Sequence, residues 1–367
     1  MARRRTAHRT HARALGMIGA AALALTALAP AHATDRQKGP DDTAAPRPAR
    51  TVSGWLPYWE QEAAYRTALR HKDQLHTVSP FWYEAKSAGR IAAHGGAGER
   101  RVIDGLHRAG IKVVPTVHEQ LGPGVLARIM TRKQSRAAHI RALVAVVRSR
   151  AYDGIDIDYE SIASTGNATY KQVRAGYATF IDQLCRTLHA MNKQCVATVS
   201  PQARGNGRIW DYRRIGAAAD RMRIMAYNMH WEGGPPGPLS SPDWYDDILR
   251  RATALVPRHK LEMALPGYGW DWPVGGKGRD KAETRHVTSK SAERLRRKVG
   301  AKYRLDPASR TPYFHYKDGK VRRTVWYQDA RGTAAHLPVL RKYGVRNTAL
   351  WALNFEDPQL WPALAKG

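Results

Sequence analysis

The sequence of 367 residues contains only two cysteines. Two cysteines can build neither a disulfide-rich scaffold nor a zinc site with four cysteine ligands. Acidic residues are also scarce, with 31 Asp and Glu against 60 Lys and Arg, which gives a formal net charge of +29. No apolar run reaches the ~20 residues that a membrane-spanning helix needs. These absences exclude a small disulfide-stabilised domain and predict no stable membrane insertion.

The first 33 residues have the pattern of an export signal. Five arginines precede or border an apolar run over Leu15–Leu28, and Ala31-His32-Ala33 matches the small residues of a cleavage site. An uncleaved anchor is the alternative interpretation. Residues 34–50 are polar and proline-rich, which predicts a flexible leader. We therefore expect a secreted, extracellular protein that associates with the cell wall.

The excess of positive charge favours anionic polymers as partners. Nucleic acid is one such polymer, but the sequence contains no basic fold motif that would support that role. Export makes an anionic cell-wall polymer the more sensible partner. The alternative is that the charge is only a background excess of arginine.

The chain from residue 51 onward alternates between short β-type runs and longer segments of helical period. This alternation predicts a parallel (β/α)8 barrel over residues 51–367, with a doubly wound open sheet as the alternative. A doubly wound nucleotide-binding sheet is disfavoured because no glycine-rich dinucleotide loop is present. The predicted strands are Val52–Tyr58, Leu75–Trp82, Lys112–Val117, Tyr152–Tyr159, Gln194–Ser200, Met222–Tyr227, Leu261–Pro266 and Thr348–Leu353.

The segment between the seventh and eighth predicted strands is about twice as long as a normal unit. Two β-rich runs, Pro312–Lys317 and Val321–Tyr327, flank an Asp318-Gly319 pair. Asp-Gly between two such runs is typical of an antiparallel hairpin. We therefore expect a small β-rich insertion, over about residues 271–330, beside the mouth of the barrel.

The two cysteines lie at the end of a predicted helix and at the start of the next strand. In an exported chain, a disulfide between Cys185 and Cys195 would close this short loop. Two buried free thiols are the alternative.

The most informative segment is Tyr152–Glu160, with the sequence YDGIDIDYE. The period of two in a strand places Asp156, Asp158 and Glu160 on one face and the apolar residues on the other. In a barrel the acidic face points inward and rises toward the C-terminal rim, where barrel active sites lie. Repulsion among stacked carboxylates holds a proton on at least one of them, as a general acid requires. The alternatives are a solvated edge strand, a calcium loop and a purely structural polar network.

DGIDIDYE resembles the DGxDxDxE signature of glycoside hydrolase family 18, the chitinase-like family. Other stretches resemble the family's strands in order and spacing, over roughly residues 51–365. VWYQDA and the proline-rich residues 233–238 most resemble the bacterial branch of spore-cortex and cell-wall N-acetylglucosaminidases. These stretches are GWLPYW from Gly54, SPFWY from Ser79, MAYN from Met225, VWYQDA from Val325, LWAL from Leu350 and EDP from Glu356.

The resemblance implies a retaining, substrate-assisted hydrolysis of β-linked N-acetylglucosaminides. Glu160 would be the acid and then the base, and Asp158 would hold the substrate's acetamido group, whose oxygen attacks the anomeric carbon. Asp156 would share a proton with Asp158. Tyr227 would hydrogen-bond the acetamido group, and Trp351 would form the floor under the sugar.

Further substrate-binding candidates are residues at predicted strand ends. Asn228 stands where many members of the family have Asp, which puts the pH optimum in doubt. The remaining candidates are Met225, Tyr83, Tyr58 and Trp270. Glu119 is the second carboxylate to consider if the substrate-assisted scheme fails.

The predicted substrate is a polysaccharide that contains N-acetylglucosamine, either peptidoglycan or chitin. The alternatives are a non-catalytic chitinase-like lectin and an endoglycosidase acting on N-glycans. No metal, nucleotide or flavin cofactor is implied, and we expect the chain to act as a monomer.

Overall fold

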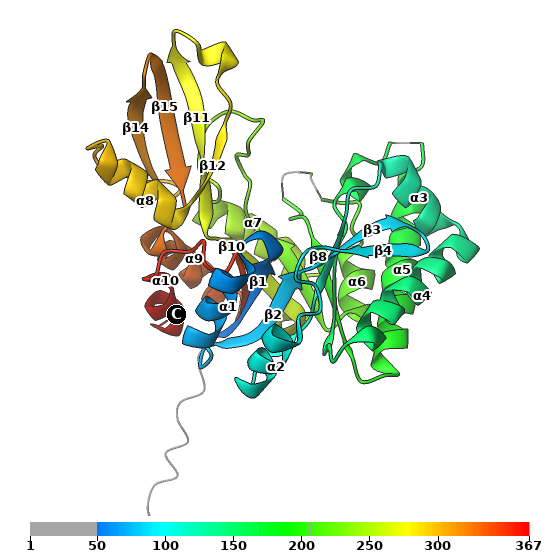
Figure 1. Ribbon diagram of the computed structural model, residues 1–367. Helices are drawn as coiled ribbons and strands as arrows, with labels where there is room; N and C mark the ends of the chain where they lie inside the picture. Colours follow the sequence, from blue (N-terminus) through cyan, green and yellow to red (C-terminus); the bar gives the residue numbers. More distant parts are fainter. Residues whose placement is uncertain (1–49, 167, 204, 206, 367) are drawn as a thin grey trace, which may run out of the picture. The chain divides into compact units, whose positions relative to one another are not determined.

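The computed structural model describes residues 50–166, 168–203, 205 and 207–366 (Figure 1). The predicted export signal and almost all of the predicted leader lie outside the described residues. None of the helices in the described ranges is long and apolar enough to cross a membrane.

The larger sheet forms the barrel that the sequence predicts. Each of the eight predicted strands is present, and the third is interrupted. The strands are β1 (Thr51–Pro57), β2 (Leu75–Phe81), β5 (Lys112–Val113) with β6 (Thr116–Glu119), β7 (Gly154–Asp158), β8 (Gln194–Val199), β9 (Arg221–Met225), β10 (Leu261–Pro266) and β16 (Asn347–Trp351). All neighbours in this ring pair in parallel, and β1 pairs with both β2 and β16.

The interrupted third strand closes the ring. Pro115 lacks a backbone N–H and divides the strand into β5 and β6. The N–H of Val114 donates to the carbonyl of Val78 in β2 over 2.9 Å, whereas the N–H of Asp156 in β7 donates to the carbonyl of Pro115, also over 2.9 Å. The third strand thus joins the second strand to the fourth. Beyond β2, the chain continues as a hairpin of β3 (Tyr83–Ser87) and β4 (Arg90–Ala93).

Helices cover the outside of the barrel, as Figure 1 shows for α4 and α5 beside the β3–β4 hairpin. In α5 the buried side chains Val173, Tyr177 and Phe180 recur every three or four residues, the spacing that puts one helical face against a sheet. The helices are α1 (Gln61–Arg70), α2 (Arg100–Arg108), α3 (Pro123–Thr131), α4 (Lys133–Ser149), α5 (Tyr170–His189), α6 (Tyr212–Ala218), α7 (Pro242–Thr253), α8 (Ser289–Lys298), α9 (Ala330–Lys342) and α10 (Leu360–Lys366).

A disulfide links Cys185 near the end of α5 to Cys195 at the start of β8. Both residues are buried in the core between the helices and the barrel. The structure therefore selects the disulfide over the two free thiols that the sequence left open.

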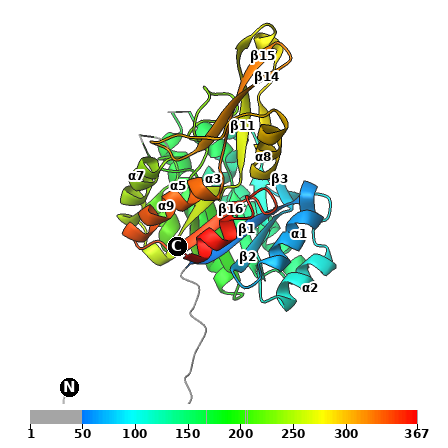
Figure 2. The ribbon, with the colours of Figure 1, turned by 90° about the vertical axis from the view of Figure 1, so that its left-hand side faces the viewer.

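The chain between β10 and β16 forms a second, antiparallel sheet in the order β12-β11-β15-β14-β13, which Figure 2 shows in orange and yellow. Asp318 and Gly319 lie at the predicted hairpin between β14 and β15, and Gly319 has the positive φ of 59° that such a turn favours. The remaining elements are β11 (Tyr268–Gly276), β12 (Arg285–Thr288), β13 (Arg304–Leu305), β14 (Pro312–Asp318) and β15 (Val321–Tyr327). Only Gly267 separates β11 from β10, so the second sheet begins at the rim of the barrel.

Candidate functional site

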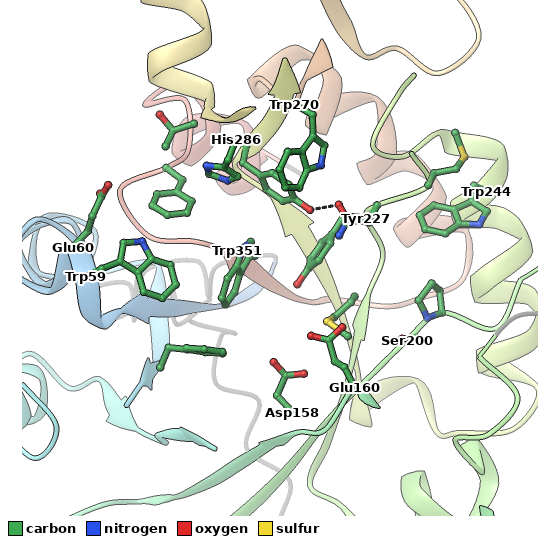
Figure 3. Close-up of a pocket in the computed structure, with 18 of the residues that line it drawn as sticks. Trp59, Glu60, Asp158, Glu160, Ser200, Tyr227, Trp244, Trp270, His286 and Trp351 are labelled. Atoms are coloured by element: carbon green, nitrogen blue, oxygen red, sulfur yellow. Dashed lines mark hydrogen bonds between the residues drawn. The ribbon is translucent and has the colours of Figure 1, made fainter. Parts of the chain in front are cut away.

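A cleft of about 890 Å³ opens at the carboxyl ends of the barrel strands. Phe81 at the end of β2, Asp158 at the end of β7, Met225 at the end of β9 and Trp351 at the end of β16 all line it. Side chains of the second sheet, including Trp270 of β11, line the cleft from above in Figure 3. This is the end of a parallel barrel at which functional sites lie.

The side chains of the acidic strand β7 alternate between the two faces of the sheet, as the period of two predicts. Ile155 and Ile157 pack in the core that includes residues of the helices. Asp156 and Asp158 are buried, whereas Glu160 follows the strand and is exposed to the cleft. The three acids therefore run from the barrel interior to the cleft.

Asp156 is the deepest of the three acids and is fully hydrogen-bonded. Its Oδ2 accepts hydrogen bonds from Nε1 of Trp55 (3.1 Å), Oγ1 of Thr116 (2.8 Å) and Nη1 of Arg223 (2.9 Å), and its Oδ1 accepts one from Oγ1 of Thr198 (2.8 Å). Burial raises the pKa of Asp156, while Arg223 and the threonine hydroxyls act against that rise.

Arg223 is a buried cation inside the barrel, with only 1% of its side chain exposed. It forms ion pairs with Asp156 and Glu262, donates a hydrogen bond to Oγ of Ser79 over 3.1 Å, and lies over the ring of Trp55 at 4.4 Å. Burial alone would lower the pKa of Arg223, but the two carboxylates more than offset it, so the pKa is raised and Arg223 stays charged. Sequence reasoning missed this group, although a charged residue within an otherwise apolar strand was a signal.

Asp158 has a different environment from Asp156. Its Oδ1 is buried and has no hydrogen-bond partner among the described residues. Burial, followed by the negative charges of Glu160 and Asp156, raises the pKa of Asp158 well above its ordinary value. Asp158 therefore holds its proton at a pH where an exposed aspartate is ionised.

Glu160 combines access to the cleft with a raised pKa. The protein that surrounds the carboxyl on its other sides raises the pKa by burial, and the nearby charge of Glu119 raises it further. Glu119 is not a lining residue. Its carboxylate accepts hydrogen bonds from the backbone N–H and the hydroxyl of Ser161 (2.7 and 2.9 Å) and from the N–H of Leu121 (2.8 Å), so it fixes the chain just after Glu160.

Aromatic rings form the opposite wall and the floor of the cleft. Trp351 packs edge-on against Trp55 and Phe81, at 5.4 and 5.3 Å between ring centroids. The hydroxyl of Tyr227 points toward Glu160 in Figure 3, and burial raises the pKa of Tyr227 well above its ordinary value, so it remains a neutral hydroxyl. Flat faces and a hydroxyl donor suit a sugar ring with its polar substituents.

Asn228 and the second sheet meet at one edge of the cleft. Asn228 has a left-handed backbone (φ 61°), and its Oδ1 accepts a hydrogen bond from the hydroxyl of Tyr268 over 2.5 Å. Trp270 also lines the cleft, with a buried indole N–H that has no partner among the described residues. Sequence reasoning named Asn228, Met225 and Trp270 but missed Tyr268, which is the first residue of β11.

Two predicted substrate-binding tyrosines are not lining residues. The hydroxyl of Tyr83 lies 2.8 Å from that of Tyr152, and the Tyr83 side chain is buried in the main core. Tyr58 stacks on the ring of His94 at 4.2 Å. Neither ring lines the cleft, because Tyr58 lies in the short helical turn Tyr58–Glu60 after β1 and Tyr83 lies in β3, which pairs with β6.

Residues 105–356 match the glycosyl hydrolases family 18. The chain belongs to this family. As a family 18 member it is a glycoside hydrolase, which agrees with the resemblance of DGIDIDYE to the family signature.

Curated relatives resemble the chain in sequence, and a solved structure resembles it in fold. The chain is 25% identical over 244 residues to an uncharacterized glycosylase, YvbX, of Bacillus subtilis, which covers 66% of this chain and 69% of the relative. It is 24% identical over 315 residues to the cortical fragment-lytic enzyme of the same organism, covering 83% and 70% respectively. The C-terminal domain of a putative chitinase from Desulfitobacterium hafniense has the same fold, with a TM-score of 0.77, 23% identity and coverage of 86% of this chain and 99% of that chain.

Proposed function

We propose that this family 18 enzyme hydrolyses β-linked N-acetylglucosaminides with retention of configuration, through a substrate-assisted mechanism. The proposal rests mainly on one observation. Glu160 is exposed to the cleft with a raised pKa, directly beyond Asp158, which holds a proton of its own. A general acid is what this chemistry requires, and Asp158 beside it is placed to hydrogen-bond the substrate's acetamido group.

In the proposed reaction, Glu160 donates its proton to the glycosidic oxygen while the substrate's acetamido oxygen attacks the anomeric carbon. The bond between the anomeric carbon and the glycosidic oxygen breaks, and its electron pair stays on the oxygen of the leaving sugar. The substrate is left as an oxazolinium ion. Asp158 and Tyr227 orient and polarise the acetamido group. Glu160 then takes a proton from a water molecule as the water attacks the anomeric carbon and opens the oxazolinium ring. This step returns Glu160 to its protonated form.

Asp156 is proposed to tune Asp158 rather than to exchange a proton with it freely. Four donors already hold the carboxylate of Asp156, and the cation of Arg223 is one of them. These partners favour the charged form of Asp156 against the rise in pKa that burial causes, and a charge on Asp156 favours the proton on Asp158. This refines the expectation that the two acids share one proton.

A mechanism with a protein nucleophile is less well supported. Apart from Asp158 and Glu160, the carboxylate on the described lining is Glu60. Glu60 accepts a hydrogen bond from Asn354 over 2.7 Å, and in Figure 3 it lies on the far side of Trp59 from Glu160. A two-carboxylate glycosidase needs its two acids on either side of one sugar.

We propose peptidoglycan or a chitin-type polymer outside the cell as the substrate. The similarity to a cortical fragment-lytic enzyme favours a cell-wall glycan, and the formal charge of +29 favours one that carries anionic polymers. Export through the first 33 residues is part of this proposal. A non-catalytic lectin and an endoglycosidase for N-glycans are the alternative functions.

The test is mass spectrometry of the products formed from N-acetylglucosamine oligomers and, separately, from purified peptidoglycan. Glu160→Gln should lower kcat by about 10²–10⁴-fold because it removes the general acid. Glu60→Gln is the matched control and should retain most of the activity. NMR of the first-formed anomer should show retention. A folded parent that binds the oligomers without releasing products would favour the lectin, and equal rates for the parent and Glu160→Gln would exclude the role of Glu160.

A further inference from the structure

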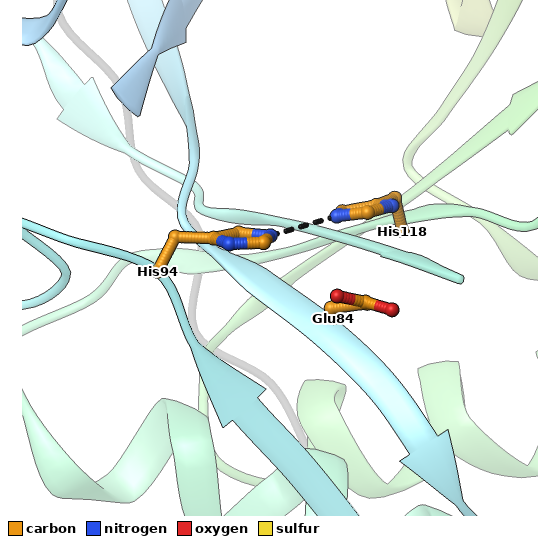
Figure 4. A group of neighbouring side chains, drawn as sticks. All are labelled: Glu84, His94 and His118. Atoms are coloured by element: carbon orange, nitrogen blue, oxygen red, sulfur yellow. Dashed lines mark hydrogen bonds between the residues drawn. The ribbon is translucent and has the colours of Figure 1, made fainter. Parts of the chain in front are cut away.

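A second group of chemically active side chains lies behind the cleft wall, formed by Glu84 of β3, His94 just after β4 and His118 of β6 (Figure 4). Glu84 is the register partner of His118 across β3 and β6 and of Ala92 across β3 and β4. His94 is two residues beyond Ala92. The strand period of two therefore puts all three side chains on the same face of the sheet.

The three side chains offer ligand atoms at one point. The Nε2 atoms of His94 and His118 face each other at 2.8 Å. One ring nitrogen of each histidine and a carboxylate oxygen of Glu84 all lie within 4.8 Å of one another. Two N–H groups cannot face each other at this distance. At least one ring is therefore neutral, with its lone pair directed at the other ring.

Aromatic stacking holds both imidazoles in place. His94 stacks on Tyr58 at 4.2 Å with an angle of 6° between the rings, and His118 stacks on Phe81 at 4.5 Å and 17°. The backbone N–H of His94 also donates to the carbonyl of Trp82 over 2.8 Å. Ligands that the fold already orients lose little conformational freedom when they bind an ion.

We propose that Glu84, His94 and His118 bind a borderline divalent transition-metal ion, with Zn²⁺ as the best match. Two imidazoles and one carboxylate are ligands that Zn²⁺ accepts, whereas Mg²⁺ and Ca²⁺ prefer oxygen ligands. Tetrahedral geometry with Zn–N distances of about 2.0–2.1 Å would place the two nitrogens about 3.3 Å apart. The rings would thus separate by about half an ångström, and water would fill the fourth position.

The ammonium group of Lys86 would compete with the metal ion for the carboxylate of Glu84. This ammonium group contacts the Glu84 carboxylate, and 44% of the Lys86 side chain is exposed, so it can swing into solvent. The bound ion would replace the ammonium and link β3, β6 and the end of β4 behind Phe81, a lining residue of the cleft. This site is independent of the proposed hydrolysis, since no step of that reaction passes through it.

The test uses the purified chain without an affinity tag, treated with a chelator and then dialysed against Zn²⁺ or Mg²⁺ near pH 7.5. We expect one Zn²⁺ per chain by elemental analysis, no retained Mg²⁺, and a rise in Tm with Zn²⁺. Bound Co²⁺ should give the visible absorption of a four-coordinate site. His94→Asn and His118→Asn should weaken Zn²⁺ binding at least tenfold, whereas Lys86→Met should strengthen it severalfold.

His259→Asn is the matched control, because His259 is exposed and lies outside the group. It should bind Zn²⁺ as the parent does. If either histidine variant fails to fold, the opposite effects of Glu84→Gln and Lys86→Met on the Zn²⁺ affinity still decide the question. The proposal is overturned if the parent retains no Zn²⁺, or if these substitutions leave the affinity unchanged.

Discussion

Nη1 of Arg223 lies 2.9 Å from Oδ2 of Asp156, and neither side chain has more than 1% of its surface exposed. Arg223 also pairs with Glu262 from the next strand, so one buried cation serves two buried carboxylates. A buried charge of this kind is costly to desolvate, and its removal leaves its partners uncompensated. The network therefore couples the stability of the barrel to the ionisation of the site.

Replacing Arg223 with Met should lower the free energy of unfolding by about 3–5 kcal/mol, because two buried carboxylates lose their cation. Urea denaturation monitored by circular dichroism measures this change. Arg66→Met is the control, since the ion pair of Arg66 with Glu62 is exposed, and we expect no measurable loss there. Equal effects of the two substitutions would contradict the role given to Arg223.

The raised pKa of Asp158 predicts a pH-dependent loss of stability. Because the pKa is higher in the folded than in the unfolded chain, the protonated carboxyl stabilises the fold below the unfolded pKa of about 3.9, and this contribution disappears as the pH rises through the folded pKa. Asp158→Asn removes the titration. The free energy of unfolding of the parent, relative to the variant, should therefore fall as the pH rises above about 4.

Urea denaturation of both proteins at several pH values from 4 to 8 gives this comparison. Asp73→Asn, at an exposed position, provides the same chemical change outside the site. Parallel curves for the parent and Asp158→Asn would show that Asp158 titrates alike in the folded and unfolded chain, contrary to the prediction.

Local patterns in the sequence were sufficient to predict the acidic strand, the barrel and the Asp318-Gly319 hairpin. Each depends on neighbours along the chain: the period of two in residues 152–160, the alternation of strand and helix, and one turn. The pairing of Arg223 with Glu262 could not be predicted in this way. It depends on the register between β9 and β10, in which these two residues are opposite each other.

The positions of the two tyrosines that do not line the cleft have a similar explanation. Tyr58 and Tyr83 follow predicted strands, and a residue at the end of a barrel strand is expected to face the cleft. The chain instead forms a short helical turn over Tyr58–Glu60 and the β3–β4 hairpin after Trp82. These local departures turn both rings toward the histidines and Tyr152.

The disulfide should contribute measurably to stability. It joins residues ten positions apart, and closing a loop of this length reduces the entropy of the unfolded chain by an amount worth about 3 kcal/mol. The double substitution Cys185→Ala and Cys195→Ala should lower the free energy of unfolding by about that amount. Refolding the parent with a reducing agent should reproduce most of the loss, whereas the reducing agent should not affect the variant. A parent that is insensitive to reduction would contradict this prediction.

Asn228 offers a way to shift the pH profile of the enzyme. Asn228 accepts a hydrogen bond from the hydroxyl of Tyr268, and the charge of Glu160 also acts on this hydroxyl. Asn228 and Glu160 are therefore close enough for a charge on one to affect the other. Asn228→Asp would add a negative charge to the cleft and raise the pKa of Glu160. Because Glu160 must be protonated to act as the acid, the alkaline fall of kcat/KM should move up by about half a unit to one pH unit.

The pH dependence of kcat/KM on an N-acetylglucosamine oligomer measures this shift. Asn192→Asp is a closely matched control, because Asn192 also has a left-handed backbone (φ 55°) but is exposed on the surface. Its profile should coincide with that of the parent. An unchanged profile for Asn228→Asp, or a shift toward lower pH, would mean that the alkaline limb does not report the protonated Glu160, because an added negative charge can only favour the proton on that carboxyl.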